Sequence, residues 1–409
     1  MRVLIANVYY PPIAFGGATI VAEQTTTLLS KMPGVKCLVL CLDAVRLRAG
    51  AFLTRYVWNG VDVVATSSSA VPGCLSYKRN GIASLNRTII DQFRPDVALI
   101  HCIQDFGAQF VIDLFESGIP VAIFFHDAWW ICEQQFMINS SGAYCFQTAI
   151  DLNVCRYCVN DIHQTRTRDI YLRSIVNRAD ARLFPSTFFK DLHINSGIVA
   201  EHSIVVKNGV LPPTNSPSRK AVLQGESSSI VRFGFLGGLG PVKGAALIES
   251  VFKTLPRTDY ELVCVDNFTN LGRKTAGFSS WRCTGTLRIR AGFTQQTIDD
   301  FYDEIDILLC PSQWKESFGL AVREALIRHK WVIVTSAGGI AEDVIPGVNG
   351  TVIPLVPHPE YLRDAVLDCF DKDWSVYRNP HARKVRTFVE QTEELYCILL
   401  DLTERQAGR

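Results

Sequence analysis

Two carboxylates eight positions apart, Glu316 and Glu324, flank a short turn-forming loop, Ser317-Phe318-Gly319-Leu320. An apolar run at 306–310 predicts a buried strand before this loop, and an apolar helical pattern begins at its end. In an open α/β sheet, ligands bind at the carboxyl ends of the strands, where a helix N-terminus offers its amides to an anion. The pattern therefore predicts that the loop amides hold a phosphate and that the two glutamates accept hydrogen bonds from sugar hydroxyls.

Four features follow one another in a fixed order between Pro311 and Gly350. They are Pro311-Ser312 at a strand end, Glu316 with Glu324, the turn Gly338-Gly339-Ile340-Ala341-Glu342, and Asn349-Gly350. Together they resemble the donor site of the retaining, family 4 glycosyltransferases of the GT-B fold. A lone pair of glutamates at this spacing is common on helices, so the specificity of the signal lies in the ordered set.

The resemblance implies an α/β protein with the GT-B fold, in which two doubly wound Rossmann-like domains face a cleft. It implies a hexosyltransferase-like, retaining enzyme that uses a nucleotide-diphosphate sugar. By this resemblance Glu324 binds the ribose, and Glu316 binds the transferred sugar and takes part in catalysis. It further implies front-face attack, with the departing phosphate taking the acceptor proton. No divalent metal is expected for catalysis, because lysine and helix N-termini neutralise the leaving group.

A glycine-rich segment follows the first strand of the second half of the chain, Leu236-Gly237-Gly238-Leu239-Gly240-Pro241-Val242-Lys243-Gly244. Glycines allow the backbone to approach a ligand, and Lys243 supplies a mobile positive charge. The resembling family has an arginine and a lysine here that clamp the donor diphosphate. This chain keeps Gly237, Lys243 and Gly244, but Gly238 stands where the arginine is usual. We therefore expect weaker stabilisation of the leaving group, with Lys243 as a catalytic residue.

Gly16-Gly17 ends the loop after the first expected strand, at residues 3–6, and precedes a helix expected from about residue 18 to 31. The segment is not the G-x-G-x-x-G fingerprint of dinucleotide-binding proteins. Taken alone it is either an ordinary glycine turn or a ligand contact. The resembling family carries a proline-containing loop ending in Gly-Gly here, which implies that Gly16 and Gly17 reach the donor phosphate.

His126 and Asp127 follow the expected strand at 121–125. The family has a histidine at the end of the matching strand, so the resemblance implies that His126 binds a donor-sugar hydroxyl or the acceptor and takes part in catalysis. A structural histidine is the alternative. Trp129 and Trp130 form either an aromatic platform for a sugar ring or part of the core.

Four of the thirteen cysteines cluster in the sequence: Cys132, Cys145, Cys155 and Cys158. The last two form a C-x2-C pair, which is half of a zinc knuckle. The surrounding loop, residues 131–160, has little regular periodicity and would gain order from a structural Zn²⁺. Free thiols or a redox pair are the alternatives.

The 409 residues exceed what one core usually supports, which predicts two domains. Alternating strand and helix patterns predict one domain at 1–209, a Pro- and Ser-rich linker at 210–229, and a second domain at 230–380. The resemblance implies that the first is the acceptor-side domain and that the second binds the donor. The resemblance implies that a last helix, within 381–409, crosses back to the N-terminal domain.

The net charge of +1, from 41 basic and 40 acidic residues, gives no reason to expect a nucleic-acid partner. We see no secretion signal and no apolar run long enough for a membrane span, and expect a cytoplasmic protein. The basic and apolar run Val45–Tyr56 suits peripheral contact with the inner face of the membrane, although a solvated surface segment is the alternative.

The predicted function is the retaining transfer of a sugar from a nucleotide-diphosphate sugar to a glycan or lipid-linked acceptor, in cell-surface polysaccharide biosynthesis. Two other functions remain open. A GT-B-fold nucleotide-sugar epimerase would release a free sugar. A nucleotide-sugar-binding protein without activity would fit the missing arginine at Gly238.

Overall fold

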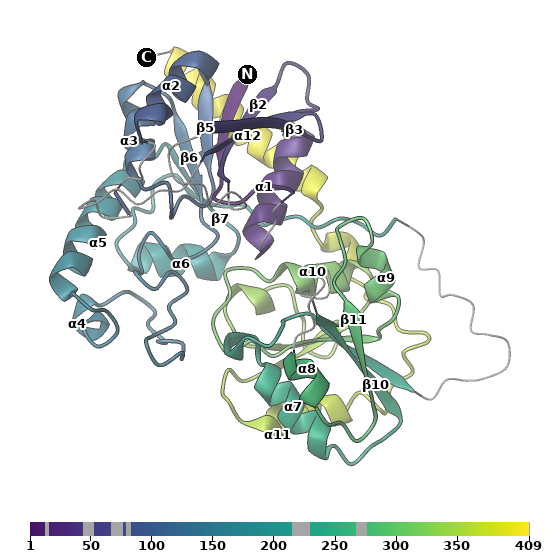
Figure 1. Ribbon diagram of the computed structural model, residues 1–409. Helices are drawn as coiled ribbons and strands as arrows, with labels where there is room; N and C mark the ends of the chain where they lie inside the picture. Colours follow the sequence, from purple (N-terminus) through teal and green to yellow (C-terminus); the bar gives the residue numbers. More distant parts are fainter. Residues whose placement is uncertain are drawn as a thin grey trace. The chain divides into compact units, whose positions relative to one another are not determined.

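The computed structural model in Figure 1 describes residues 1–12, 16–43, 53–66, 77–78, 83–214, 230–266 and 276–408. The chain divides into two compact units. The N-terminal unit contains Met1–Ser140, Cys145–Gly209 and Phe388–Arg409, and the C-terminal unit contains Ser141–Tyr144 and Val210–Thr387. Each unit is built around one sheet.

The sheet of the N-terminal unit has the strand order β3-β4-β2-β1-β5-β6-β7-β8. Its strands pair in parallel except for the edge strand β3, which runs antiparallel to β4. Strands buried on both faces read as continuous apolar runs, which is why the sequence revealed most of them. The strands are β1 (Arg2–Ala6), β2 (Lys36–Leu42), β3 (Leu53–Trp58), β4 (Val61–Thr66), β5 (Val97–Ile100), β6 (Val121–Phe124), β7 (Ala181–Phe184) and β8 (Ser203–Val205).

The helices of this unit connect successive strands, as a parallel sheet requires. Several begin at a capping side chain: Asp161 accepts hydrogen bonds from the amides of His163 and Gln164, and Ser186 accepts one from Phe189. The helices between strands are α1 (Gly16–Leu29), α2 (Ala83–Phe93), α3 (Gln109–Glu116), α4 (Leu152–Cys155), α5 (Ile162–Val176) and α6 (Thr187–Asn195).

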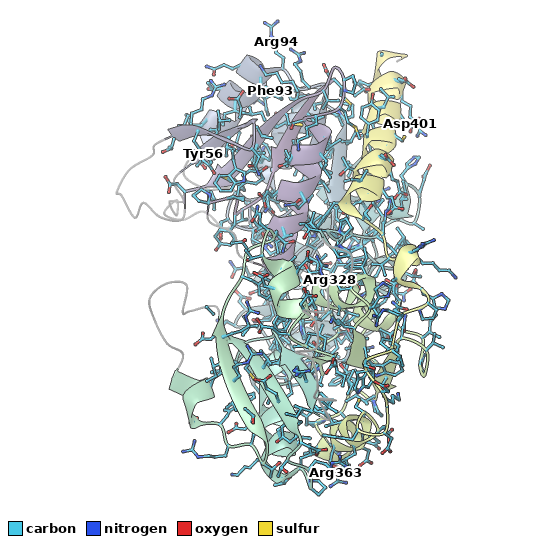
Figure 2. The ribbon with its side chains drawn as sticks, turned by 90° about the vertical axis from the view of Figure 1, so that its right-hand side faces the viewer. Tyr56, Phe93, Arg94, Arg328, Arg363 and Asp401 are labelled. Atoms are coloured by element: carbon cyan, nitrogen blue, oxygen red, sulfur yellow. The ribbon has the colours of Figure 1, made fainter. Side chains whose placement is uncertain are left out.

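The last helix, α12 (Phe388–Ala407), also belongs to the N-terminal unit. It is drawn in yellow in Figure 1, where it is labelled α12, and in Figure 2, where Asp401 marks its position. Leu395, Leu399 and Leu402 follow one another at helical spacing and are buried in the core of the N-terminal sheet, together with residues of β1, β2 and β5. The N-terminal core is therefore completed by residues far along the chain.

The C-terminal unit has a parallel sheet with the order β11-β10-β9-β12-β13-β14. The predicted α/β architecture of two parallel, doubly wound sheets is confirmed. The strands are β9 (Val231–Phe235), β10 (Tyr260–Asp266), β11 (Thr286–Ala291), β12 (Ile307–Cys310), β13 (Trp331–Thr335) and β14 (Gly350–Ile353).

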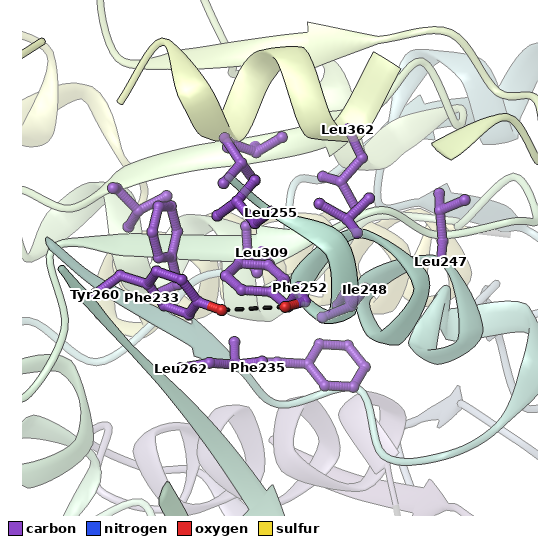
Figure 3. Close-up of a cluster of buried hydrophobic side chains, with 14 of the residues drawn as sticks. Phe233, Phe235, Leu247, Ile248, Phe252, Leu255, Tyr260, Leu262, Leu309 and Leu362 are labelled. Carbon is purple, nitrogen blue, oxygen red and sulfur yellow. Dashed lines mark hydrogen bonds between the residues drawn. The ribbon is translucent and has the colours of Figure 1, made fainter. Parts of the chain in front are cut away.

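Two hydrophobic clusters cover the faces of this second sheet. Figure 3 shows one of them, in which Phe233, Phe252 and Tyr260 pack edge to face and the Tyr260 hydroxyl donates to the Phe252 carbonyl over 3.1 Å. The helices are α7 (Ala245–Thr254), α8 (Ala276–Ser280), α9 (Ile298–Tyr302), α10 (Leu320–Ile327) and α11 (Pro359–Leu367), with 3-10 turns at Pro241–Lys243, Gly339–Ala341 and Ala382–Lys384.

The sequence pattern at residues 281–284 predicts a strand, but this prediction is wrong, since β11 begins at Thr286. Trp281 instead ends a turn, with its amide donating to Phe278, and its ring packs on Phe278 inside the core. Its apolar character reflects this packing rather than a place in the sheet. Among the described residues, none of the helices has the length and apolar character needed to span a bilayer.

Candidate functional site

Lys243 and Glu316 form an ion pair at the carboxyl edge of the C-terminal sheet. Lys243 ends the 3-10 turn that follows β9, and Glu316 lies in the loop after β12; the two strands are neighbours in the sheet. The Lys243 Nζ lies 2.9 Å from the Glu316 Oε1, and the Ser312 hydroxyl donates to the same oxygen. The structure thus brings together the two charged residues that the sequence assigned to catalysis.

The ionised form of Glu316 is favoured by its neighbours. Burial acts to raise the pKa of this carboxyl group, but the charge of Lys243 and the hydrogen bonds from Ser312 and Lys243 outweigh it. The pKa of Glu316 therefore lies below its ordinary value. The Lys243 ammonium also lies 5.2 Å from the centre of the Trp314 ring, a cation–π contact. Lys243 thus has two partners near its charged end.

The glycines beside Lys243 are required by close packing. A Cβ on Gly244 would lie 2.1 Å from the Pro311 carbonyl oxygen, and the residue has a φ of +79°. A Cβ on Gly237 would lie 2.6 Å from the Phe235 ring and 2.9 Å from the Lys243 Cβ. These two positions hold the lysine against the end of β12.

Gly238, where the family resemblance places an arginine, is different. An added Cβ would meet no heavy atom within 4 Å, so nothing excludes a side chain by contact. The φ of +67° is nevertheless a conformation that residues with a Cβ rarely adopt. The backbone rather than crowding favours glycine at this position.

The loop at residues 316–319, which we call the donor loop, is joined to the glycine loop at residues 337–343. The Glu316 amide donates to the Ala337 carbonyl and the Gly339 amide donates to the Glu316 carbonyl, each over 2.9 Å. Gly319 has a φ of +85°, and a Cβ there would lie 2.6 Å from the Ile340 side chain. The backbone of Glu316 and the start of α10 are therefore fixed by the Gly-Gly turn.

Glu324 has surroundings unlike those of Glu316. It is buried on α10, and its Oε2 accepts a hydrogen bond from the Tyr302 hydroxyl over 3.0 Å. Burial raises the pKa of Glu324, and this outweighs the opposing hydrogen bonds from Tyr302 and Gln295 and the charge of Arg328. The second glutamate is therefore held in a fixed orientation by neutral donors.

In the N-terminal unit, His126 forms a stacked pair with His101 at the carboxyl ends of β6 and β5. The His101 Nδ1 lies 2.8 Å from the His126 Nε2, and both rings stack with Phe124. Burial lowers the pKa of His101 to about 3. Burial, and then the charge of His101, also lower the pKa of His126. Both histidines are therefore neutral at pH 7.

A small pocket opens beside this pair. Asp127 organises one side of it: Oδ2 accepts hydrogen bonds from Gln104 over 2.7 Å and from Gln135 over 2.8 Å, and Oδ1 accepts one from the Trp129 amide. Burial raises the pKa of Asp127 despite these donors. The lining residues are His101, Cys102, Ile103, Gln104, Phe124, His126, Asp127, Trp129 and Trp130.

Trp129 and Trp130 pack edge to face with ring centres 4.9 Å apart, and both are buried. The Arg168 guanidinium lies 5.2 Å from the centre of the Trp129 ring, and it donates to the Trp129 carbonyl. Of the two alternatives for these rings, the structure favours core packing over an open sugar platform.

Gly16 and Gly17 begin α1, after residues that lie outside the described part of the chain. Gly16 has a φ of +75°, and an added Cβ there would meet no atom within 4 Å. Both glycines are exposed. Their contact with a donor phosphate stays a prediction.

The predicted four-thiolate zinc site is not formed in this structure. Among the described residues, which include all four cysteines, no three His, Cys, Asp or Glu side chains are arranged to hold a metal ion. Burial raises the pKa of Cys132 to about 12 and also raises that of Cys155. Cys132 interacts electrostatically with Cys145 and Cys155, and Cys155 with Cys145 and Cys158, so the four thiols lie in one region of the segment. Protein contacts order the segment instead: Gln135 binds Asp127, and the Thr165 hydroxyl donates to Glu133.

The segment predicted to contact a membrane, Val45–Tyr56, falls largely outside the described residues. Its last residues begin β3, along which Leu53, Arg55 and Val57 are exposed in alternation. The predicted linker at 210–229 is described only as far as residue 214, where the Thr214 amide and hydroxyl donate to Asp299.

Three participants in these sites were missed by reasoning from the sequence. His101 occupied the end of an expected strand, but only the fold shows that it faces His126. Tyr302 was hidden in a short helix, although its hydroxyl orients Glu324. Arg323, directly before Glu324, joins the donor loop to the glycine loop. For Arg323, the signal in the sequence was an arginine within an apolar helical pattern.

A comparison with protein-family models finds a match in the C-terminal unit. Residues 231–379 match the family described as Glycosyl transferases group 1. The resemblance drawn from the motifs is confirmed by this match. The matched segment contains Lys243, Glu316 and Glu324.

Two curated proteins are similar in sequence. An uncharacterized 42.6 kDa protein in the cps region of Klebsiella pneumoniae is 22% identical over 398 residues, covering 91% of this chain and 97% of that protein. The lipopolysaccharide 1,2-N-acetylglucosaminetransferase of Salmonella typhimurium is 28% identical over 186 residues, which cover 42% of this chain and 48% of that enzyme.

Solved structures share the fold over almost the whole chain. The sucrose-phosphate synthase of Thermosynechococcus elongatus has a TM-score of 0.69 at 13% identity and covers 99% of each chain. HepE of Anabaena, in complex with UDP and glucose, has a TM-score of 0.65 at 15% identity and covers 98% of this chain and 99% of its own. At these identities the likeness establishes the GT-B fold.

Proposed function

We propose that this protein is a retaining, hexosyltransferase-like glycosyltransferase that moves a sugar from a nucleotide-diphosphate sugar to a glycan or lipid-linked acceptor. One observation carries the proposal: Lys243 and Glu316 meet as an ion pair over 2.9 Å at adjacent strand ends of the unit that matches the group 1 family. The similarity to a protein of the cps region and to a lipopolysaccharide N-acetylglucosaminetransferase supports a role in cell-surface polysaccharide biosynthesis.

In this proposal the C-terminal unit binds the donor. When the donor binds, the Lys243 ammonium turns partly from Glu316 toward the diphosphate and neutralises its charge. The amides at the start of α10 donate further hydrogen bonds to the diphosphate. Glu324, oriented by Tyr302, accepts hydrogen bonds from the ribose hydroxyls. Glu316 accepts one from the transferred sugar. Because Lys243 and these amides stabilise the leaving group, the proposed reaction needs no divalent metal.

The chemical step follows from the state of the carboxylates. Glu316 is held by Lys243 and Ser312, and Glu324 is buried beside Tyr302, which supports a mechanism without a covalent intermediate. The donor bond between the anomeric carbon and the phosphate oxygen breaks. The acceptor oxygen forms its bond on the same face, and its proton passes to the departing phosphate. The anomeric configuration is thereby retained.

The acceptor side is assigned to the N-terminal unit, near the neutral pair His101 and His126. Uncharged hydrogen-bonding groups suit the hydroxyls of a sugar acceptor. Because the donors are nucleotide sugars and the proposed acceptors include lipid-linked glycans, we place the reaction on the cytoplasmic side, with peripheral contact to the inner face of the membrane.

One observation favours a second function, the binding of a nucleotide sugar without its transfer. Gly238 stands where the family clamp has an arginine, and its surroundings leave room for a side chain. A clamp with a single cation could bind a nucleotide sugar without transferring it. Gly238→Arg restores the usual charge at the cost of about 1 kcal/mol of backbone strain. If the chain is a binder that has lost activity, transfer appears only in this variant.

The direct test is turnover. Purified wild-type protein is incubated with UDP-, GDP-, ADP-, CMP- and dTDP-sugars and with a membrane extract as the source of acceptor. We expect release of one nucleotide that depends on the extract, and a product whose anomeric configuration, read by NMR, equals that of the donor. Free sugar without an extended product points to an epimerase or hydrolase. An inverted product would falsify the retaining mechanism.

A further inference from the structure

Arg323 is a fully buried arginine on α10, next to Glu324. Its side chain is 2% exposed, and with Arg182 it is among the largest fully buried side chains among the described residues. The motifs that predicted the donor site give it no role. Its contacts, however, lie entirely within the loops that carry the site.

The guanidinium joins the donor loop to the glycine loop. Its Nε donates to the Asp343 Oδ2 over 2.7 Å, and its Nη2 donates to the Gly339 carbonyl over 2.7 Å. Its Nη1 donates to the Ile340 carbonyl over 3.0 Å and to the Phe318 carbonyl. One rigid fork therefore fixes backbone groups of two separate loops, which a lysine could not do.

These contacts set the direction of the loop amides. In a trans peptide the carbonyl and the following N–H point in opposite directions. Because the Phe318 carbonyl faces Arg323, the Gly319 N–H points away from it. Because the Gly339 carbonyl also faces Arg323, the Ile340 N–H points away from the arginine as well. Arg323 thus directs backbone donors of both loops outward from the protein interior, which is the orientation that an anionic ligand needs.

Stability alone gives little reason for a charge at this place. Burial lowers the pKa of Arg323, while Asp343 acts in the opposite direction. Buried ion pairs are often replaceable by apolar side chains without loss of stability, because taking the charges out of water offsets their attraction. The Phe318 ring, 4.1 Å from the guanidinium carbon, adds a cation–π contact but no second acid. Control of loop geometry is the better explanation.

We propose that Arg323 is a positioning residue that holds the donor loop and the glycine loop in the arrangement that binds the nucleotide sugar. It acts through Glu316 and the backbone amides and does not contact the ligand. The inference rests on the proposed function for its ligand, but the ordering of the loops can be measured without any ligand.

The experiment compares Arg323→Met and Arg323→Lys with Arg182→Met by hydrogen exchange on the full chain. Arg182 is the matched control: it is equally buried, and it donates to the carbonyls of Val176, Ala179 and Glu201 in the N-terminal unit. We expect peptides covering 316–320 and 337–343 to exchange about tenfold faster in both Arg323 variants, because local opening becomes easier, and to be unchanged in Arg182→Met. Unchanged exchange in the Arg323 variants overturns the proposal.

Binding of UDP and GDP, followed by calorimetry, is the second readout. The nucleotide that wild type binds should bind at least about tenfold more weakly to Arg323→Lys, with turnover reduced by up to about 10²-fold through misplacement of the donor. Loosened loops with unchanged nucleotide affinity overturn the positioning role. If wild type binds neither nucleotide and transfers no sugar, the proposed function fails, and the ordering of the loops is judged by exchange alone. Should Arg323→Met not fold, Asp343→Asn removes the one acidic partner and takes its place.

Discussion

At the carboxyl ends of β9 and β12 a lysine and a glutamate face each other as ions, whereas at the ends of β5 and β6 two histidines share one hydrogen bond as neutral rings. Both pairs lie at equivalent edges of parallel sheets, and in each pair one member, Glu316 or His101, is largely withdrawn from water. The two pairs differ in whether neighbouring groups compensate the cost of a buried charge. Glu316 has Lys243 and Ser312 to hold its charge, while in the histidine pair protonation of one ring would face a second ring and the apolar Phe124.

Under the proposed function, this difference predicts different ligands for the two edges. An edge that keeps charge when buried can neutralise a diphosphate, because electrostatic interactions are strong where water is excluded. An edge that keeps its groups neutral suits hydroxyls, which need hydrogen bonds and not charge. The predictions below test whether the two edges respond to substitution and to pH as this comparison requires.

The largest effect is expected from removing the cation. Lys243→Met should reduce turnover by about 10²-fold or more, the usual cost of losing one electrostatic stabiliser. Lys253→Met, an exposed lysine on α7, is the control and should behave as wild type. Steady-state release of nucleotide measures both. Full activity of Lys243→Met would remove the charged edge from the mechanism.

The next effect separates the two glutamates. Glu324→Gln should mainly raise the donor KM, because ribose contacts are the same in the ground and transition states. Glu316→Gln should lower kcat by about tenfold or more, as its contact strengthens while the sugar gains positive charge. Measuring kcat and KM for each variant checks the split. Equal, small changes in both parameters for both variants would show that the pair is misplaced.

A smaller effect is expected at the neutral edge. His101 Nε2 is buried without a hydrogen-bond partner among the described groups. An unsatisfied buried N–H is rarer than an unsatisfied acceptor, so His101 carries its proton on Nδ1 and donates to His126 Nε2. His126 then carries its own proton on Nδ1 and can donate it to a ligand. Nitrogen-15 chemical shifts of the two rings read this arrangement directly.

Two substitutions of His101 test whether its proton lies on Nδ1. His101→Phe keeps the ring but removes the donor, and should lower kcat by about tenfold, the value of one neutral hydrogen bond. His101→Asn can keep a donor and should recover part of the loss. A wild-type spectrum with the His126 proton on Nε2 would reverse the direction of the bond and contradict the comparison as drawn here.

The sequence predicted more of the charged edge than of the neutral one, for a physical reason. Glu316, Lys243 and the glycines carry their roles in local spacing, since a loop between a strand and a helix positions them. The contact of His101 with His126 depends on two strands being neighbours, and Tyr302 reaches Glu324 from another helix. The zinc site stays a prediction, because the spacing of the cysteines brings the thiols into one region but does not fix the geometry that a metal needs.

The last prediction uses pH. The pKa values of His101 and His126 are lowered by burial, so the unfolded chain binds protons that the folded protein does not, and stability falls as pH drops below about 6.5. The pKa of Glu316 is also lowered, but its contribution is lost only as pH falls below about 4.5. The raised pKa of Asp127, beside the histidines, acts in the opposite direction. His193 is a further buried histidine, and burial lowers its pKa to about 4. Between pH 6.5 and 4.5 the buried histidines, two of which form the neutral edge, should therefore dominate the loss of stability.

Unfolding temperatures measured across this window should fall by about 2–4 °C for each 1 kcal/mol lost. The double variant His101→Asn/His126→Asn should reduce the slope, because two of the titrating rings are gone, while His193 and His329, whose pKa values burial also lowers, keep the remainder. His163→Asn, an exposed histidine on α5, is the control and should leave the slope as in wild type. An equal slope in the double variant would mean that the pH response comes from elsewhere and that the two edges do not differ in the way their contacts indicate.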